Sequence, residues 1–201
     1  MNYETFQRND FDDEERIRER WWKPIPGEII LDIGSAIGSY ALPAVCSGAE
    51  VYAFSSPNHA VLLKHNLALN PGALARCHVM EHGLYSAQGF LTCDGSHYYF
   101  QADDPGDLGE HGLRVMRLDD LGIHNVGMMK IDVEGAEVEV LKGGEQTIRK
   151  YTPRVLVENH VFMQADLEKE VIKWFEGLGL GYQHETDPSP AVSHSFFWVP
   201  R

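Results

Sequence analysis

Basic residues are scarce in this chain of 201 residues. It holds 17 Lys and Arg against 30 Asp and Glu, which gives a formal net charge of −13. Nucleic acids and anionic membranes are bound through Lys and Arg side chains that displace counterions. The charge balance therefore argues against both kinds of partner.

Cysteines and long apolar runs are also few. Cys46, Cys77 and Cys93 are far apart and form no C-x-x-C pair, so neither a disulfide framework nor a zinc site is indicated, and we expect buried, reduced thiols. No run approaches the roughly 20 apolar residues that span a bilayer, and the first residues hold no apolar signal segment. These absences predict a cytoplasmic protein.

The composition, with 43% hydrophobic and 23% charged residues, is that of a folded domain. The length favours one domain with an appendage. Residues 1–26 are polar and are expected to form a helical appendage or lid around a helix at Asp12 to Arg20. Residues 27–201 are expected to form the main domain.

Short apolar runs alternate with helical segments after residue 27. We expect strands at residues 28–33, 50–54, 77–81, 128–133, 154–158, 181–184 and 193–199, and helices at residues 37–46, 57–70, 134–150 and 166–178. Ser56 is the expected N-cap of the second of these helices. A hairpin is expected at residues 89–101 around Asp94-Gly95, followed by a surface loop from Asp103 to Gly112. The alternation predicts an α/β fold, with a parallel sheet covered on both faces and ligands at the carboxyl ends of its strands.

A glycine-containing turn follows the first expected strand. Asp32 ends the strand, and Gly34 and Gly38 let the backbone turn tightly into a helix. The pattern differs from the G-x-G-x-x-G of dinucleotide binders because the acid comes first. Asp32 would repel a diphosphate and attract a cation, such as the ammonium or sulfonium of S-adenosylmethionine. A turn without any ligand is the structural alternative.

Two further strand ends carry polar side chains. In the first, Asp132, Glu134, Glu137 and Glu139 lie within eight residues, and strand alternation places Lys130 and Asp132 on one face.

In the second, Glu158 and His160 share a face of the neighbouring strand. A carboxylate beside an imidazole can orient it for general-base chemistry on a hydroxyl. Acids favoured by a helix dipole, and a histidine that only forms hydrogen bonds, are the structural alternatives.

Taken together, these motifs resemble the FkbM family of S-adenosylmethionine-dependent methyltransferases. The resemblance covers most of residues 27 to 182. The motifs that carry it are the D-x-G-x-x-x-G turn, Asn66 to Asn70, the phrase Leu118-Asp119-Asp120-Leu121, the block from Lys130 to Gly143, and Pro153 with Glu158-Asn159-His160. It implies a class I methyltransferase (Rossmann-like) fold, which is a mostly parallel sheet of seven strands with an antiparallel last strand. It also implies O-methylation of a sugar or a natural-product hydroxyl.

The resemblance also implies roles for individual residues. The cofactor would be lined by Asp32, Gly34, Ser35, Gly38, Ser55, His82 and Asp132. Asp132 and Glu134 would lie beside the transferred methyl group. Asp132 or His160 is the candidate base, and Glu158 is expected to orient His160. A divalent metal held by Asp132, Glu158 and His160 is possible but less favoured.

One position departs from the family pattern. The second strand usually ends in an acid that holds the ribose hydroxyls, but here the strand is followed by Ser55. A serine in place of a carboxylate loses on the order of 1 to 3 kcal/mol of binding free energy. The departure leaves open a noncatalytic binding module with the same fold.

Other classes of enzyme agree less well with the sequence. A dehydrogenase conflicts with Asp32, a serine hydrolase lacks a G-x-S-x-G elbow, and RNA methylation conflicts with the acidic charge. Acids around the site disfavour an anionic acceptor, so a neutral small-molecule hydroxyl compound is expected. Oligomeric state is not indicated by the sequence.

Overall fold

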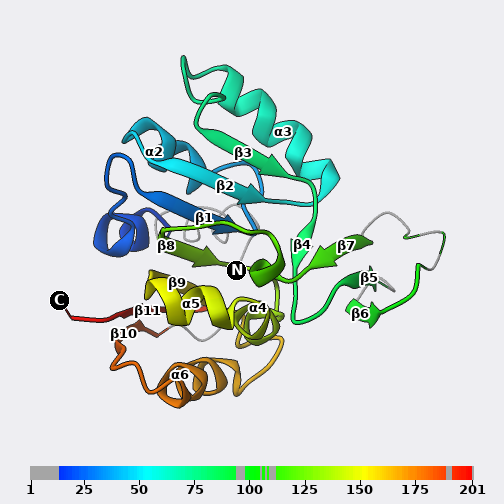
Figure 1. Cartoon of the computed structure of the whole chain (residues 1–201), viewed down its shortest axis with the longest axis vertical. Coiled ribbons are helices and arrows are strands. Elements are labelled where there is room, and N and C mark those ends of the chain that lie inside the picture. Colours follow the sequence, from blue (N-terminus) through cyan, green and yellow to red (C-terminus); the bar gives the residue numbers. More distant parts are fainter. Residues whose placement is uncertain are drawn as a thin grey trace, which may run out of the picture.

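Seven strands form one sheet, in the order β10-β11-β9-β8-β1-β2-β3 (Figure 1). The structure is a computed structural model, which describes residues 14–93, 98–104, 106, 108, 112–188 and 192–200, except the side chains of Cys93 and Tyr98. The strands of this sheet are β1 (Ile29–Ile33), β2 (Glu50–Phe54), β3 (Cys77–Met80), β8 (Val126–Ile131), β9 (Arg154–Asn159), β10 (Gln183–Asp187) and β11 (Ser193–Trp198).

The sheet is parallel except at one strand. β1 pairs in parallel with β2 and β8, and β3 and β9 extend the sheet in the same direction. β11 runs antiparallel to both of its neighbours, β9 and β10. Both the predicted fold class and the antiparallel last strand are confirmed. The carboxyl ends of β1, β2, β8 and β9 therefore share one edge of the sheet.

Helices cover both faces of the sheet, as the alternation of apolar residues requires. They are α2 (Ala41–Cys46), α3 (Pro57–Ala68), α4 (Glu137–Gly143), α5 (Glu145–Tyr151) and α6 (Leu167–Gly177), with a 3-10 turn η1 (Leu118–Asp120). On one face, Leu31, Met129 and Val155 pack against α4, α5 and α6. On the other, Ile30 and Met128 pack against α2, α3 and residues 14–22.

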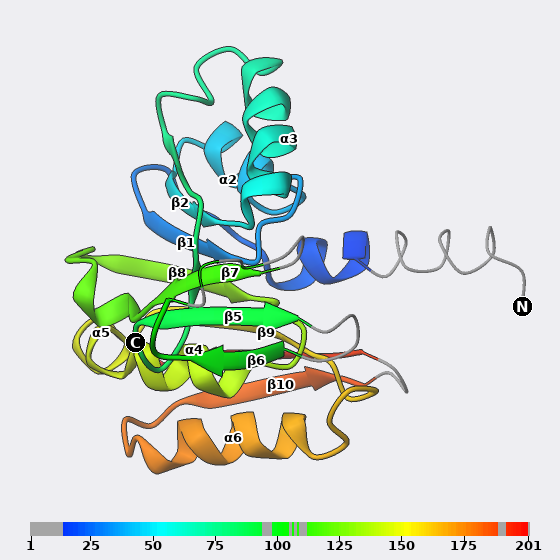
Figure 2. The ribbon, with the colours of Figure 1, turned by 90° about the vertical axis from the view of Figure 1, so that its right-hand side faces the viewer.

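Residues 14–21 form a helix, drawn in dark blue in Figure 2, that packs on this second face. Ile17, Trp21 and Trp22 are buried in its contact with the sheet. Arg20 pairs with Glu185 of β10 at 2.9 Å. The described part of the expected N-terminal appendage is thus built into the core, and residues 1–13 of the segment lie outside the described residues.

A second, smaller sheet lies to one side of the first (Figure 1). Its order is β4-β7-β5-β6, and its strands are β4 (Gly83–Leu84), β5 (Gly89–Cys93), β6 (Tyr98–Gln101) and β7 (Leu113–Met116). The expected hairpin is confirmed by the antiparallel pairing of β5 and β6, although its turn lies outside the described residues. Much of the predicted loop at residues 103–112 also lies outside them. β4 and β7 were not predicted.

Two helix predictions were wrong in extent. The helix expected at residues 37–46 begins only at Ala41, because Gly38 adopts a φ of +103° in the preceding turn. The helix expected at residues 134–150 is divided at Gly144 into α4 and α5. A Cβ atom on Gly144 would lie 2.8 Å from Leu118 Cδ2, so the break lets η1 pack closely against the chain.

The Ser56 N-cap is confirmed, because its side chain accepts a hydrogen bond from the His59 backbone N–H.

Cys46 and Cys77 are free thiols, but Cys46 is exposed, contrary to the expected burial. The side chain of Cys93 lies outside the described residues. Across the described residues, no helix combines the length and apolar character needed to cross a membrane.

Asp119 ties η1 to the start of α5. Its carboxylate accepts hydrogen bonds from the Gln146 N–H at 3.1 Å and from the N–H and hydroxyl of Thr147, both at 2.9 Å. Its side chain is only 3% exposed. The carboxylate therefore caps a helix to which it does not belong.

We predict that Asp119→Ala lowers the free energy of unfolding by about 1 to 3 kcal/mol, because three donors at the start of α5 lose their acceptor. Urea unfolding followed by circular dichroism measures the change. Asp120→Ala is the matched control, since this neighbouring side chain is 51% exposed, and a change within about 0.5 kcal/mol is expected. Equal effects of the two substitutions would contradict the capping role.

Candidate functional site

Polar side chains gather at the carboxyl edge of the sheet, on the face covered by α2. Alternation along β1, β8 and β9 places Asp32, Lys130 and Glu158 on the same face as Ile30, Met128 and Leu156. Asp32 is in register with Lys130, and Glu158 is in register with His194 of β11. Lys130 therefore lies on the same face as Asp32 and Glu158, while Ile131 belongs to the core on the other face.

The Lys130 ammonium is the buried cation of this edge. Its Nζ donates to the Gly34 carbonyl at 3.0 Å and to Asp132 Oδ2 at 2.7 Å, and it lies 3.9 Å from Asp32 Oδ1. It also lies 5.0 Å from the centre of the Tyr40 ring. Burial acts to lower the pKa of Lys130, but the nearby carboxylates of Asp132 and Asp32 raise it by more. The net pKa lies above the ordinary value, so Lys130 stays charged.

Asp32 is fully buried, and neither of its carboxylate oxygens accepts a hydrogen bond of normal geometry from the described residues. Burial raises the pKa of Asp32 to about 6, and Asp132 adds to this rise while the Lys130 cation opposes it. A buried carboxylate that lacks hydrogen bonds is costly unless a ligand or partner uses it. Asp32 is therefore a candidate acceptor for a ligand's cation or donor groups.

The glycine turn after β1 has a structural reason as well. Gly34 has a φ of +84°, and a Cβ atom there would lie 1.7 Å from the Asp132 carbonyl oxygen. The hydroxyl of Ser35 is turned inward and donates to the Asp32 carbonyl at 2.6 Å. Gly34 thus lets the first turn lie directly on the end of β8, which brings Asp32 and Asp132 to the same site.

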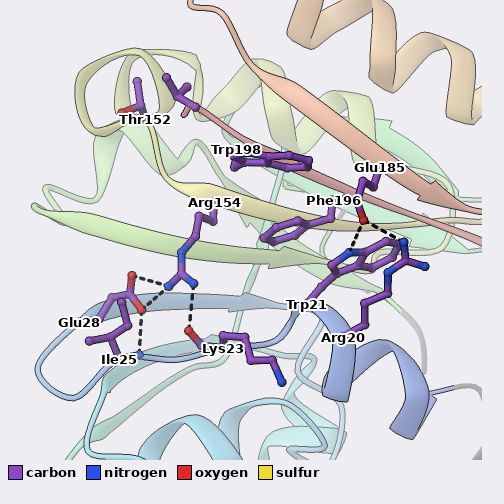
Figure 3. Close-up of a pocket in the computed structure, with 11 residues that line it drawn as sticks. Arg20, Trp21, Lys23, Ile25, Glu28, Thr152, Arg154, Glu185, Phe196 and Trp198 are labelled. Carbon is purple, nitrogen blue, oxygen red and sulfur yellow. Dashed lines mark hydrogen bonds and ion pairs between the residues drawn. The ribbon is translucent and has the colours of Figure 1, made fainter. Parts of the chain in front are cut away.

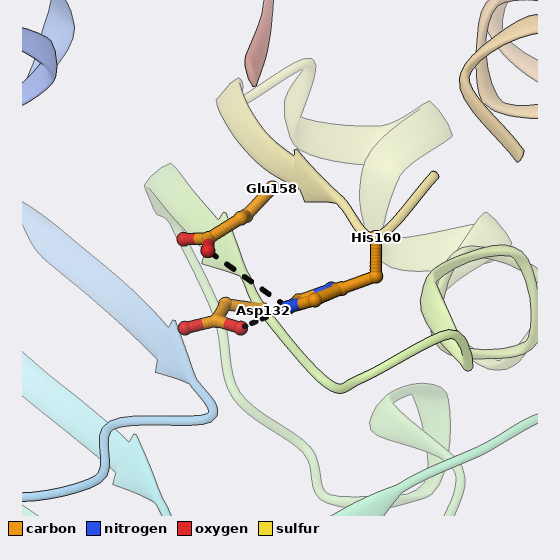
Figure 4. A group of neighbouring side chains, drawn as sticks. All are labelled: Asp132, Glu158 and His160. Atoms are coloured by element: carbon orange, nitrogen blue, oxygen red, sulfur yellow. Dashed lines mark ion pairs between the residues drawn. The ribbon is translucent and has the colours of Figure 1, made fainter. Parts of the chain in front are cut away.

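His160 lies at the centre of a cluster of carboxylates just after β9 (Figure 4). Its Nδ1 forms a 2.9 Å hydrogen bond with Glu137 Oε1. Its Nε2 lies 3.6 Å from Asp132, 3.4 Å from Glu134 and 3.8 Å from Glu158. The structure therefore brings together all four residues expected to act in catalysis.

The orientation of His160 differs from the expectation. Glu158 was expected to orient the ring, but its oxygen is 3.8 Å away, beyond hydrogen-bond distance. The Nδ1 atom of His160 instead donates a hydrogen bond to Glu137, which is fully buried in the first turn of α4. Burial acts to lower the pKa of His160, but the hydrogen bond to Glu137 and the carboxylates of Glu134 and Asp132 raise it to about 9.

Glu134 occupies an unusual backbone conformation between β8 and α4. Its φ is +54°, in the left-handed region, and Gly135 follows with a φ of +96°. This conformation is uncommon for residues other than glycine and asparagine. Burial raises the pKa of Glu134, although its side chain is 61% exposed. The turn points a carboxylate at His160 while leaving it open to a ligand.

Two expected cofactor residues lie at the ends of the neighbouring strands. Ser55 directly follows β2, is 5% exposed, and its hydroxyl oxygen is buried without a hydrogen bond in the described part of the chain. His82 follows β3, and its ring meets the Phe54 ring edge-on with centroids 5.5 Å apart. Both follow strands that end at the predicted edge of the sheet.

Sequence reasoning overlooked the two groups that organise the site. Glu137 was noted only among several acids, and Lys130 only for its strand face. Glu137 contacts His160 across 23 residues of sequence, and Lys130 contacts Gly34 across 96. A charged residue inside an otherwise apolar strand was the signal that marked Lys130, and no local signal distinguished Glu137 from Glu139.

A pocket of about 560 Å³ lies away from this cluster (Figure 3). It is near the amino ends of the strands, since Arg154 begins β9 and Glu28 precedes β1. Four of its charged groups are already paired, because Arg154 donates to both oxygens of Glu28 and Arg20 pairs with Glu185. The pocket offers an aromatic wall at Trp198 but no titratable cluster, so we place the candidate site at the carboxyl edge.

Comparison with known proteins agrees with this geometry. The family model described as "Methyltransferase FkbM domain" matches residues 32–183, which include the whole carboxyl edge. No curated protein matches the sequence.

Solved structures share the fold. The methyltransferase FkbM of Methylobacillus flagellatus KT is 18% identical, with a TM-score of 0.66, over 86% of this chain and 44% of that chain. A precorrin-6y C5,15-methyltransferase of Geobacter metallireducens is 13% identical, with a TM-score of 0.55, over 89% and 83%. An rRNA methylase of Streptococcus thermophilus is 10% identical, with a TM-score of 0.56, over 88% and 90%. The present chain thus spans less than half of the first of these proteins.

We predict that Asp32→Asn stabilises the ligand-free protein at pH 8 by on the order of 1 to 3 kcal/mol. The pKa of Asp32 in the folded protein, about 6, lies above its ordinary value, so the carboxyl favours folding at low pH. This contribution is lost as the pH rises through 6. Asparagine carries no charge and escapes the loss.

Urea unfolding at pH 4 and pH 8 tests this prediction. The stability difference between the variant and the wild type should be small at pH 4 and large at pH 8. Asp120→Asn removes an exposed carboxylate and serves as the control. A difference that is the same at both pH values would show that Asp32 is not held at a raised pKa.

Proposed function

Because the chain belongs to the FkbM methyltransferase domain family, we propose that it transfers a methyl group from S-adenosylmethionine to a hydroxyl group. The proposed acceptor is a sugar or a small natural-product-like compound without negative charge. The clustered carboxylates at the carboxyl edge would repel an anionic acceptor. The family supports methyl transfer, and the choice of a hydroxyl acceptor is our own inference.

One observation carries the proposal. The buried Asp32 carboxylate lies beside a glycine turn at the end of β1 and accepts no hydrogen bond of normal geometry from the described residues. The nearby Ala41 N–H and Ser35 hydroxyl only partly offset the rise of its pKa. Asp132 and Glu134 lie at the end of the adjacent strand. This arrangement fits a ligand with positive charge and hydrogen-bond donors, which S-adenosylmethionine provides. When bound, it would supply a methyl group already activated by its sulfonium.

The protein's own contribution would be positioning and proton transfer. Gly34 and Gly38 would let the cofactor approach the backbone, with Asp32, Ser35, Ser55 and His82 around it. Asp132, or His160 in its neutral form at a pH above its raised pKa, would take the hydroxyl proton as the oxygen accepts the methyl group. Glu137, by its hydrogen bond to Nδ1, would hold the His160 ring in place.

A noncatalytic binding module is the second candidate. Ser55 favours it, since a family acid is replaced by a residue whose hydroxyl is buried. The retention of Asp32, both glycines and the full carboxylate cluster favours the enzyme instead.

Calorimetric titration with S-adenosylmethionine and release of S-adenosylhomocysteine in the presence of neutral hydroxyl compounds test the proposal. We expect cofactor binding by the wild type, and lower turnover with Asp132→Asn and His160→Gln at nearly unchanged cofactor affinity. Glu139→Gln, on the exposed side of α4 and paired with Lys142, is the control. Absence of binding at millimolar cofactor would favour the binding module, and unchanged turnover in both variants would remove the proposed bases.

Ser55→Asp should restore a charged acceptor for the ribose hydroxyls. We predict roughly a five- to hundredfold gain in affinity for S-adenosylmethionine. Ser56→Asp is the matched control, because it adds the same charge one residue later and aspartate also serves as an N-cap. Equal affinities of the two variants would mean that position 55 does not contact the ribose.

A further inference from the structure

The Nε2 atom of His160 points into a group of oxygens without bonding to any of them. Asp132 Oδ1, Glu134 Oε2 and Glu158 Oε1 lie 3.4 to 3.8 Å from it, beyond the usual hydrogen-bond distance. The His160 side chain is only 4% exposed. Ligand atoms of Asp132, Glu158 and His160 all lie within 4.8 Å of one another.

The distances from Nε2 to the Asp132 and Glu158 oxygens, 3.6 and 3.8 Å, suit a cation placed between the three side chains. Two ligands each about 2.1 Å from one ion lie about 3 to 4 Å apart. In Figure 4 the two carboxylates and the imidazole point toward a common centre. Glu158 lies in β9, and Asp132 and His160 directly follow β8 and β9, whose pairing positions both strand ends.

Glu137 provides a second and independent observation. Its buried carboxylate accepts the hydrogen bond of Nδ1 at 2.9 Å, and it also accepts one from the Gly135 N–H at 3.1 Å. Histidines that bind metals characteristically donate their other ring nitrogen to a carboxylate, which fixes the tautomer and aims the free nitrogen at the ion. Here the aimed nitrogen is Nε2.

The negative charge around His160 also favours binding of a cation. Four carboxylates lie within 4 Å of the His160 ring nitrogens. Lys130 is held between Asp132 and the Gly34 carbonyl, so its charge is directed toward β1. Glu134 is largely exposed and leaves the cluster open to solvent, which gives an ion a path of entry.

We propose that Asp132, Glu158 and His160 form a binding site for a divalent transition-metal ion, with Glu137 as the positioning residue for His160. Two carboxylates and one imidazole suit Mn²⁺ and related ions better than Ca²⁺, which takes oxygen ligands only. If the proposed methyl transfer is correct, an ion at this place would bind the acceptor oxygen and lower the pKa of its hydroxyl. The ion site itself does not depend on that activity.

Mn²⁺ is the probe for the experiment. The full chain without a polyhistidine tag is titrated with Mn²⁺ in the absence of cofactor, and the free ion is followed by its six-line electron paramagnetic resonance signal. We expect the wild type to deplete the signal, and Asp132→Asn, Glu158→Gln and His160→Gln to lose this depletion. Glu137→Gln should weaken Mn²⁺ binding about 10- to 100-fold.

Glu139→Gln is the matched control, since it makes the same change on the same helix outside the cluster. Circular dichroism checks that each variant is folded. The proposal is overturned if the folded wild type leaves the signal unchanged, or if Glu158→Gln and His160→Gln bind Mn²⁺ as the wild type does. Titration with S-adenosylmethionine in a chelator separates the two ideas, because a chain that binds cofactor but no Mn²⁺ refutes only the ion site.

Discussion

The buried ammonium of Lys130 is the interaction on which the acidic edge of the sheet depends. It joins the end of β1, through the Gly34 carbonyl, to Asp132 at the end of β8. It is also the cation nearest to the buried carboxylate of Asp32. A buried charge is costly unless it is paired and hydrogen-bonded, and here one lysine forms a hydrogen bond with Asp132 and offsets the charge of Asp32 from 3.9 Å. Without it, Asp32 and Asp132 would repel each other across adjacent strands.

This pairing leaves the second half of the site with surplus negative charge. Asp132 uses Oδ2 for Lys130, so Oδ1 remains directed toward His160. Glu137 then fixes the ring from the opposite side. The site is thus a chain of contacts from β1 through β8 to β9, in which each charged group orients the next. A change at Lys130 would therefore be felt at His160, although the two do not touch.

The parts of the fold that depend on local sequence were predicted, and those that depend on distant contacts were not. β2 was placed correctly because its apolar run is bounded by polar residues, and α3 because Ser56 and Pro57 mark its start. The ends of the parallel strands were expected to carry Asp32, Asp132, Glu134, Glu158 and His160, and such strand ends share one edge of the sheet. The close packing of Leu118 on Gly144 depends on the tertiary fold, and the partner of His160 depends on which acid of α4 faces inward. Neither follows from spacing alone.

The contacts of the helix at residues 14–21 bear on the order in which parts of the protein assemble. Arg16 pairs with Asp187, 171 residues later, and Trp21 stacks on Phe196 with ring centroids 5.9 Å apart. The ribosome releases the first residues long before β10 and β11 exist. This helix can therefore meet β1 early, but it gains its contacts with Asp187 and Phe196 only after the C-terminal strands have emerged. Its docking is thus completed among the last steps of folding.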